Sequence, residues 1–151
     1  NNRGMAFADI GMWGEAEASF RRSAELLPAI EPHIGLANMF CTTMNLEGAA
    51  AEYRAALAID PGCVDAHFNL GNWHDEQGRF DEAEKCYLEA IRINPRYADA
   101  FFNLALLHER RNDLMRAISY WQSYLRLDST SDWAREARKQ LDRLKKSVRS
   151  K

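Results

Sequence analysis

The amino-acid sequence predicts an all-α protein built from stacked antiparallel helix hairpins. The first observation is that matching small and aromatic residues recur at one constant interval: Ala49, Ala83 and Ala117, and Tyr53, Tyr87 and Trp121. The second is that apolar residues recur within each repeat at the three- and four-residue spacing of amphipathic helices. A helical pattern repeated at a fixed period is typical of solenoids, in which each hairpin buries its apolar face against the next.

The repeat divides the chain into a partial unit and three complete ones. The partial unit covers residues 1–29, and the complete units cover 30–63, 64–97 and 98–131. From Ala16 and Phe20 to Ala49 and Tyr53 the interval is shorter by one, so one residue is missing from the connection near Pro28. Loops absorb such deletions easily. We therefore expect one domain over residues 1–151.

The unit 64–97 illustrates the predicted hairpin. Its two amphipathic helices carry their apolar faces at Leu70, Trp73 and His74, and at Ala83, Tyr87, Ala90 and Ile91. Between them Gly78 is expected in the left-handed conformation that ends a helix, and Gly11 and Asn112 hold the same position in other units. We expect Asp81 to be the N-cap of the second helix and Pro95 to close the unit.

A final helix is expected over residues 131–148 as the solvating cap of the stack. Ser129, Thr130 and Ser131 are candidate N-caps. The inward stripe comprises Trp133, Ala134, Ala137, Leu141 and Leu144. The outward face comprises Arg135, Arg138, Lys139, Arg143 and Lys146. At the front, where Met5, Phe7 and Met12 lie near the edge, no matching cap is recognised, so that end is either a boundary or a self-association surface.

The motif of the repeat resembles a known family. From His67 to Pro95 the chain reads H-x-x-L-G-x-x-H, then A-x-x-x-Y, then P, which is similar to the tetratricopeptide repeat with His67 in place of the usual opening aromatic residue. The resemblance covers nearly the whole chain. It implies a right-handed α-solenoid, the tetratricopeptide superhelix, with a concave groove lined by the first helix of each unit and with a C-terminal capping helix.

The groove that this resemblance implies is lined by first-helix residues that face away from the second helices. The candidate peptide-binding residues are Asn38, Asp65, Phe68, Asn69, Asn72, Asp75, Asp99, Phe102, Asn103, Leu106 and Glu109. In unit 30–63 the same line includes Glu31, Ile34, Gly35 and Cys41.

Asparagine on this line needs an explanation, because its side chain competes for backbone hydrogen bonds inside a helix. An amide both donates and accepts, so it can bond the main chain of an extended peptide of any sequence. The arrangement is similar to the asparagine ladder of some peptide-binding tetratricopeptide grooves, including that of the O-GlcNAc transferase family. The alternative is that Asn69 and Asn103 bridge adjacent helices.

The chemistry of the groove predicts the kind of partner. Phe68 and Phe102 hold the same position in successive units, where they either anchor apolar or Arg side chains or cover the neighbouring unit. With the aspartates, they favour a protein or peptide that is basic or mixed basic and apolar. The carboxylate clamp of chaperone-binding members needs Lys and Arg where this sequence holds Ile34, Asp99 and Asn103, so an acidic chaperone C-terminal tail is not expected to bind.

Catalytic and metal chemistry are not expected. His33 and His67 share one repeat position and His74 and His108 another, which indicates helix-packing histidines, and no His/Cys spacing matches a zinc site. No P-loop, dinucleotide or nucleophile motif is present. We therefore expect no enzyme activity, no cofactor and no metal.

Charge and cysteine usage bear on partners and localisation. Residues 132–151 carry 8 Lys/Arg against 3 Asp/Glu, whereas the whole chain has a net charge of −2. Because acids interrupt this basic stretch, we interpret it as a solvated capping helix and expect neither nucleic acid nor a membrane as partner. Three cysteines without a C-x-x-C pair, and the lack of a recognisable secretory signal, predict a cytoplasmic protein.

The leading functional prediction is a protein–protein interaction scaffold with an acidic, Asn-lined groove. A second hypothesis is a regulatory or targeting segment of a larger, possibly bacterial, enzyme or transcription regulator. A third is a self-assembly module that forms homo-oligomers through the uncapped N-terminal end.

Overall fold

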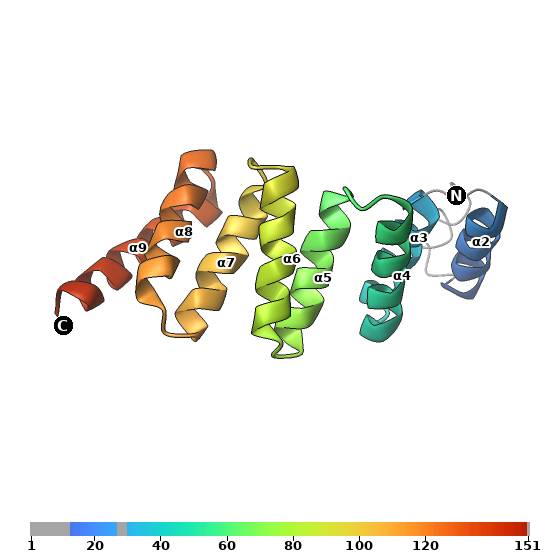
Figure 1. Cartoon of the computed structure of the whole chain (residues 1–151), viewed down its shortest axis with the longest axis horizontal. Coiled ribbons are helices and arrows are strands. Elements are labelled where there is room, and N and C mark those ends of the chain that lie inside the picture. The colour runs from blue at the N-terminus through green and yellow to red at the C-terminus, as the bar shows by residue number, and fades with distance from the viewer. Residues whose placement is uncertain (1–12, 27–29, 151) are drawn as a thin grey trace. The chain divides into compact units, whose positions relative to one another are not determined.

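The computed structural model describes residues 13–26 and 30–150, and every regular element in these residues is an α-helix (Figure 1). The helices are α2 (Trp13–Leu26), α3 (Ile30–Thr42), α4 (Leu46–Ile59), α5 (Val64–Glu76), α6 (Phe80–Ile93), α7 (Ala98–Arg110), α8 (Leu114–Leu127) and α9 (Asp132–Arg149). The predicted all-α class is therefore confirmed. The chain separates into two compact units, residues 1–73 and 74–151, and each is described by itself. The predictions for Met5, Phe7, Gly11 and Met12 lie outside the described residues.

In the first unit α3 packs against both α2 and α4. Phe20 of α2 is completely buried, and its ring lies where a Cβ atom on Gly35 of α3 would be, 2.4 Å from the nearest ring carbon. His33 Nδ1 lies 2.7 Å from Oε2 of Glu52 on α4. Close packing of α2 and α3 thus depends on a glycine, and Gly35 is buried and not exposed on the predicted groove face.

In the second unit α7 packs against α6 and α8, and α9 packs against α8. The buried cluster that joins α7, α8 and α9 comprises Ala105, Ala117, Trp121, Tyr124, Ala134, Ala137, Leu141 and Leu144. Alanines fill many of these positions, so the helix backbones approach closely while Trp121 and Tyr124 fill the remaining volume.

The left-handed turn residues fall where the repeat predicts. Gly78 has φ 75° and Asn112 has φ 60°, and both follow the first helix of their unit. Met44, which holds the same repeat position in the preceding unit, has φ 64°. Residue type does not predict the left-handed conformation of Met44, because a side chain with a Cβ atom is disfavoured there.

The capping predictions are partly correct. Ser131 is the N-cap of α9, and its hydroxyl accepts a hydrogen bond from the amide of Ala134 at 3.0 Å. The prediction for Asp81 is wrong: α6 begins at Phe80 after Arg79, and Asp81 lies in its first turn. There its carboxylate pairs with Arg111 at 2.5 Å and has a negative charge near the positive end of the helix dipole.

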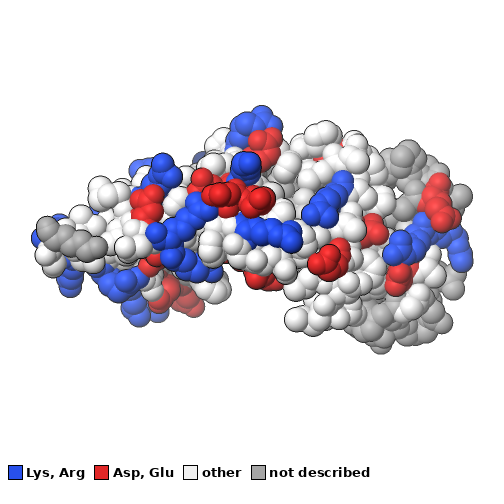
Figure 2. All heavy atoms as spheres, turned by 60° about the horizontal axis from the view of Figure 1, so that its bottom comes forward, with Lys and Arg blue, Asp and Glu red and all other residues white. Residues whose placement is uncertain are grey.

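The face pattern of α9 is confirmed with one exception. Ala134, Ala137, Leu141 and Leu144 are buried, but the side chain of Trp133 is 65% exposed. The predicted outward residues are all exposed, and Figure 2 shows basic side chains over the end of the molecule formed by α9. None of the described helices combines the length and the apolar character needed to cross a membrane.

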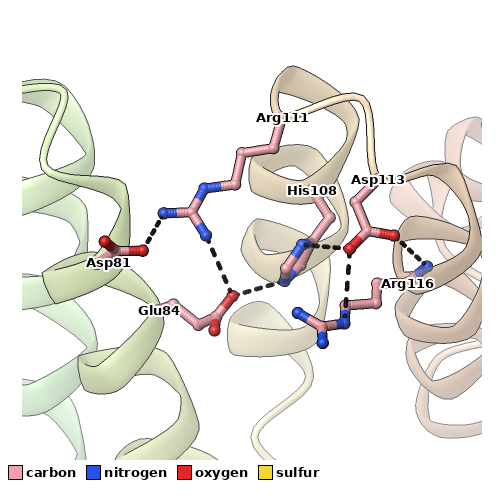
Figure 3. A network of polar contacts seen from close by, with 6 residues as sticks. All are labelled: Asp81, Glu84, His108, Arg111, Asp113 and Arg116. Atoms are coloured by element: carbon pink, nitrogen blue, oxygen red, sulfur yellow. Dashed lines mark hydrogen bonds and ion pairs between the residues drawn. The ribbon is translucent and has the colours of Figure 1, made fainter.

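A polar network joins α6, α7 and the turn before α8 (Figure 3). His108 is only 1% exposed, and its Nε2 lies 2.7 Å from Oε2 of Glu84. Its Nδ1 lies 3.9 Å from Oδ2 of Asp113, the N-cap of α8. Its ring stacks on Tyr120 with the centroids 5.4 Å apart. His108 is thus a packing residue with polar neighbours, and within the described residues no group of three or more potential ligands is placed to hold a metal ion.

Candidate functional site

The predicted groove residues share one structural property: none of them is buried. Asn38 lies on α3, the five residues from Asp65 to Asp75 lie on α5, and the five from Asp99 to Glu109 lie on α7. On each of the last two helices the spacing of three and four residues places them along one face. Helix geometry therefore places these side chains on faces that are at least partly open to solvent.

A repeated hydrogen bond connects this face to the core. In three successive repeats the buried aromatic residue at one position of the second helix donates to a side chain of the first helix. The bonds are Tyr53 to Asn38 Oδ1 at 3.1 Å, Tyr87 to Asp75 Oδ2 at 3.5 Å, and Trp121 Nε1 to Glu109 Oε2 at 2.9 Å. Burial raises the pKa of both tyrosines above 10, so their hydroxyls remain protonated donors. The face residues thus satisfy buried donors as well as facing solvent.

Asn103 and Asn69 differ in their internal contacts. The amide nitrogen of Asn103 donates to the hydroxyl of Tyr87 at 3.5 Å, so this residue bridges α7 and α6 as the alternative interpretation expects. Asn69 makes no side-chain hydrogen bond with any residue that the structure describes.

The acids of the second unit differ in whether an arginine side chain forms an ion pair with them. Nη2 of Arg110 lies 2.7 and 2.6 Å from the two carboxylate oxygens of Asp75, and Arg143 pairs with Glu109. Asp99 is exposed and forms no ion pair with the described part of the chain. Among these three acids, the negative charge is therefore compensated at Asp75 and Glu109 and, within the described residues, not at Asp99.

A pocket of about 200 Å³ lies next to Asp99. It is lined by Asp99, Phe102, Asn103, Tyr124 and Trp133, which come from α7, α8 and α9. The first three of these residues are predicted from the sequence as binding residues, whereas Tyr124 and Trp133 are not. A signal for Trp133 was present, because the repeat interval that separates Asp65 from Asp99 also separates Asp99 from Trp133 on the capping helix.

Phe102 is the centre of an aromatic cluster in this pocket. Its ring meets the rings of Trp121, Tyr124 and Trp133 edge to face, with centroids 4.8, 5.2 and 5.6 Å apart. Such contacts hold each ring in a defined orientation. Phe102 thus supports the pocket wall from inside, and the largely exposed Trp133 forms its outer edge.

Asp128 holds the pocket wall to the turn before α9. Its carboxylate accepts hydrogen bonds from the hydroxyls of Ser131 and Tyr124, the latter at 2.7 Å. These bonds lower the pKa of Asp128 from 3.8 to about 2. Burial, together with the bond to Asp128, raises the pKa of Tyr124 to about 12, and the charge of Asp99 adds to this increase.

Comparison with known proteins identifies the repeat. A family model described as "TPR repeat" matches residues 37–74 and 76–112, and one described as "Tetratricopeptide repeat" matches residues 99–131. No curated protein matches the chain in a sequence search.

Solved structures share the fold. A structure titled "Crystal structure of MamA protein" is 17% identical, with a TM-score of 0.80 over 98% of this chain and 85% of that one. PilF of Pseudomonas aeruginosa is 28% identical, with a TM-score of 0.79 over 97% of this chain and 66% of that one. A third, titled "First TPR of Spaghetti (RPAP3) bound to HSP90 peptide SRMEEVD", is 16% identical, with a TM-score of 0.71 over 80% of this chain and 96% of that one.

Proposed function

The chain belongs to the tetratricopeptide repeat family, and we propose that it is a protein–protein interaction scaffold that binds a peptide or partner segment on the exposed face of its first helices. The observation that carries this proposal is the pocket on α7, because three of its lining residues are among those predicted for binding. Leu106, one turn further along α7, is 36% exposed and extends the apolar surface of the same face. Exposed apolar and aromatic residues beside polar ones are typical of sites that anchor a peptide.

The charge of the face favours a basic or mixed basic and apolar partner. Asp99 has no counter-charge among the described residues, so a cationic side chain gains an ion pair there. The Spaghetti domain was solved with the acidic peptide SRMEEVD. In this chain the acids of such a peptide would meet Asp99, and Ile34 and Asn103 offer no positive charge. We therefore assign no binding of acidic chaperone tails to this face.

The proposal includes no catalytic step, cofactor or metal, because the recurring chemistry of the repeat is packing and surface presentation. The three cysteines are free, as expected for a cytoplasmic protein, and this localisation remains a prediction. The hypotheses of a regulatory segment in a larger protein and of self-assembly through the N-terminal end also remain predictions.

A peptide-display selection tests the proposal. Peptides enriched by the wild-type chain from a random library are resynthesised, and their affinity is measured by fluorescence anisotropy for wild type and for Asn69→Ala with Asn103→Ala. Loss of two main-chain hydrogen bonds predicts an affinity about tenfold weaker. Lys85→Ala, an exposed change on α6, is the control and leaves the affinity unchanged.

Two outcomes contradict the proposal. If no peptide is enriched, the scaffold function is wrong. If the enriched peptides bind the double variant as tightly as wild type, the asparagines do not form a ladder. Thermal unfolding followed by circular dichroism verifies that the double variant is folded, because Asn103 also donates to Tyr87.

A further inference from the structure

Asp75 and Glu109 each form an ion pair with an arginine, and Asp99 differs from them in this respect. Asp75 pairs with Arg110 and Glu109 pairs with Arg143, in each case about one repeat further along the chain. Each cation comes from the next first helix or from the capping helix. At the same separations along the sequence from Asp99, the chain has Trp133 and Ala134. The protein thus supplies an aromatic ring where the other two acids receive a guanidinium group.

The ring and the acid line the same pocket. Asp99 comes from the first turn of α7 and Trp133 from the first turn of α9, and both line the volume of about 200 Å³ described above. Trp133 is 65% exposed, although the other stripe residues of α9 are buried. An exposed tryptophan beside a carboxylate that forms no ion pair with the described residues combines the two groups that bind a guanidinium group: a π-face and a bidentate acceptor.

The rest of the pocket fits a long side chain. Phe102 is partly buried and Tyr124 is 3% exposed, so their rings offer apolar surface below the rim. The methylene groups of an arginine can cover such a surface while its charged end stays at the rim. Nearby charge is also favourable, because Asp128 has its pKa lowered to about 2 by the hydroxyls of Ser131 and Tyr124 and remains ionised at neutral pH.

We propose that this pocket, defined by Asp99, Phe102, Asn103, Tyr124 and Trp133, binds the guanidinium group of an arginine in a partner peptide. The carboxylate of Asp99 pairs with the guanidinium group, and the indole of Trp133 covers its plane. Arginine is preferred to lysine because its planar group stacks on aromatic rings and donates two parallel hydrogen bonds, whereas an ammonium group is a compact and strongly hydrated charge. This inference rests on the proposed peptide-binding function and names the side chain that the face selects.

Direct titration tests the pocket without a known partner. The probe is N-acetyl-arginine-N-methylamide, added to the ¹⁵N-labelled full chain and followed by NMR, with the lysine and citrulline analogues in parallel. We expect saturable shifts of the Trp133 indole signal and of the Asn103 amide signals with arginine, several-fold weaker binding of lysine, and no binding of the uncharged citrulline. Equal binding of lysine and arginine, or no saturable shift with arginine, overturns the assignment.

Matched variants complete the test. Asp99→Asn is expected to weaken arginine binding at least about tenfold, and Trp133→Leu about three- to tenfold. Both side chains are exposed, so the variants should fold as wild type does. Two control variants should leave binding unchanged. Asp142→Asn removes a negative charge from an exposed position on α9, and Met115→Leu changes a side chain that is 65% exposed. An unchanged affinity in Asp99→Asn overturns the proposal.

The display-selected peptides separate the two levels of the hypothesis. If these peptides respond to the Asn69 and Asn103 substitutions but not to Asp99→Asn or to replacement of their arginines by citrulline, the scaffold function stands and the arginine pocket is wrong. If no peptide is selected but the arginine probe saturates the pocket, the scaffold function is wrong and the pocket assignment stands as a site for a single cationic group.

Discussion

Tyr124 donates its hydroxyl hydrogen to Oδ2 of Asp128 at 2.7 Å, and the same carboxylate organises the turn that leads into α9. Its oxygens accept hydrogen bonds from the hydroxyl of Ser131 and from the amides of Thr130 and Ser131 at 3.4 and 3.2 Å. Ser131 in turn caps α9. One carboxylate therefore connects a wall of the pocket at the end of α8 with the helix that carries Trp133.

This relationship predicts an acid-sensitive contribution to stability. The pKa of Asp128 in the folded chain is about 2, below its ordinary value of 3.8, so the ionised carboxylate stabilises the fold above about pH 4. The contribution is lost as the pH falls from about 4 through about 2. We expect Asp128→Asn to lower the melting temperature at pH 7 and the difference from wild type to shrink as the pH falls from about 4 through about 2. A difference that does not depend on pH would contradict the role of the charge.

Gly35 predicts a packing defect. In Gly35→Ala the new Cβ would lie 2.4 Å from the ring of Phe20, which is completely buried, so the ring or the helix must move. Such overpacking costs about 1–3 kcal/mol, partly offset by the roughly 1 kcal/mol advantage of Ala over Gly in a helix. Urea unfolding measures the loss. Gly14→Ala on α2 is the control: no atom lies within 4 Å of its Cβ position, and we expect no destabilisation.

Met44 predicts a stabilising substitution. Its φ of 64° is unfavourable for a side chain with a Cβ atom, and the side chain is 76% exposed, so it contributes little packing. Met44→Gly should raise the free energy of unfolding by about 0.5–1 kcal/mol, because relief of the left-handed strain exceeds the added entropy of the unfolded chain. Met115→Gly changes the same residue type at an exposed helical position and should lower stability by up to about 1 kcal/mol. A loss of stability in Met44→Gly would show that the turn is not strained.

The sequence was sufficient to predict the helices and the face that they present. The repeat period and the apolar spacing are local properties, so the turn at Gly78, the left-handed Asn112 and the cap at Ser131 follow from residue type and position. That none of the predicted groove residues is buried also follows, because helical periodicity places them outside the apolar stripe. The errors at Asp81 and Gly35 concern one-residue placement at a helix end and the neighbour on another helix, which the pattern does not specify.

The helix hairpins of the tetratricopeptide type could be predicted without coordinates, because each repeat encodes its own helices and turns. The three-dimensional arrangement of the helices was needed to see that Asp75 and Glu109 pair with Arg110 and Arg143 whereas Asp99 forms no ion pair with the described residues, and that Trp133 is exposed beside it. The physical reason is distance along the chain: these pairs join residues of different repeats, and whether two charges meet depends on side-chain directions from separate helices.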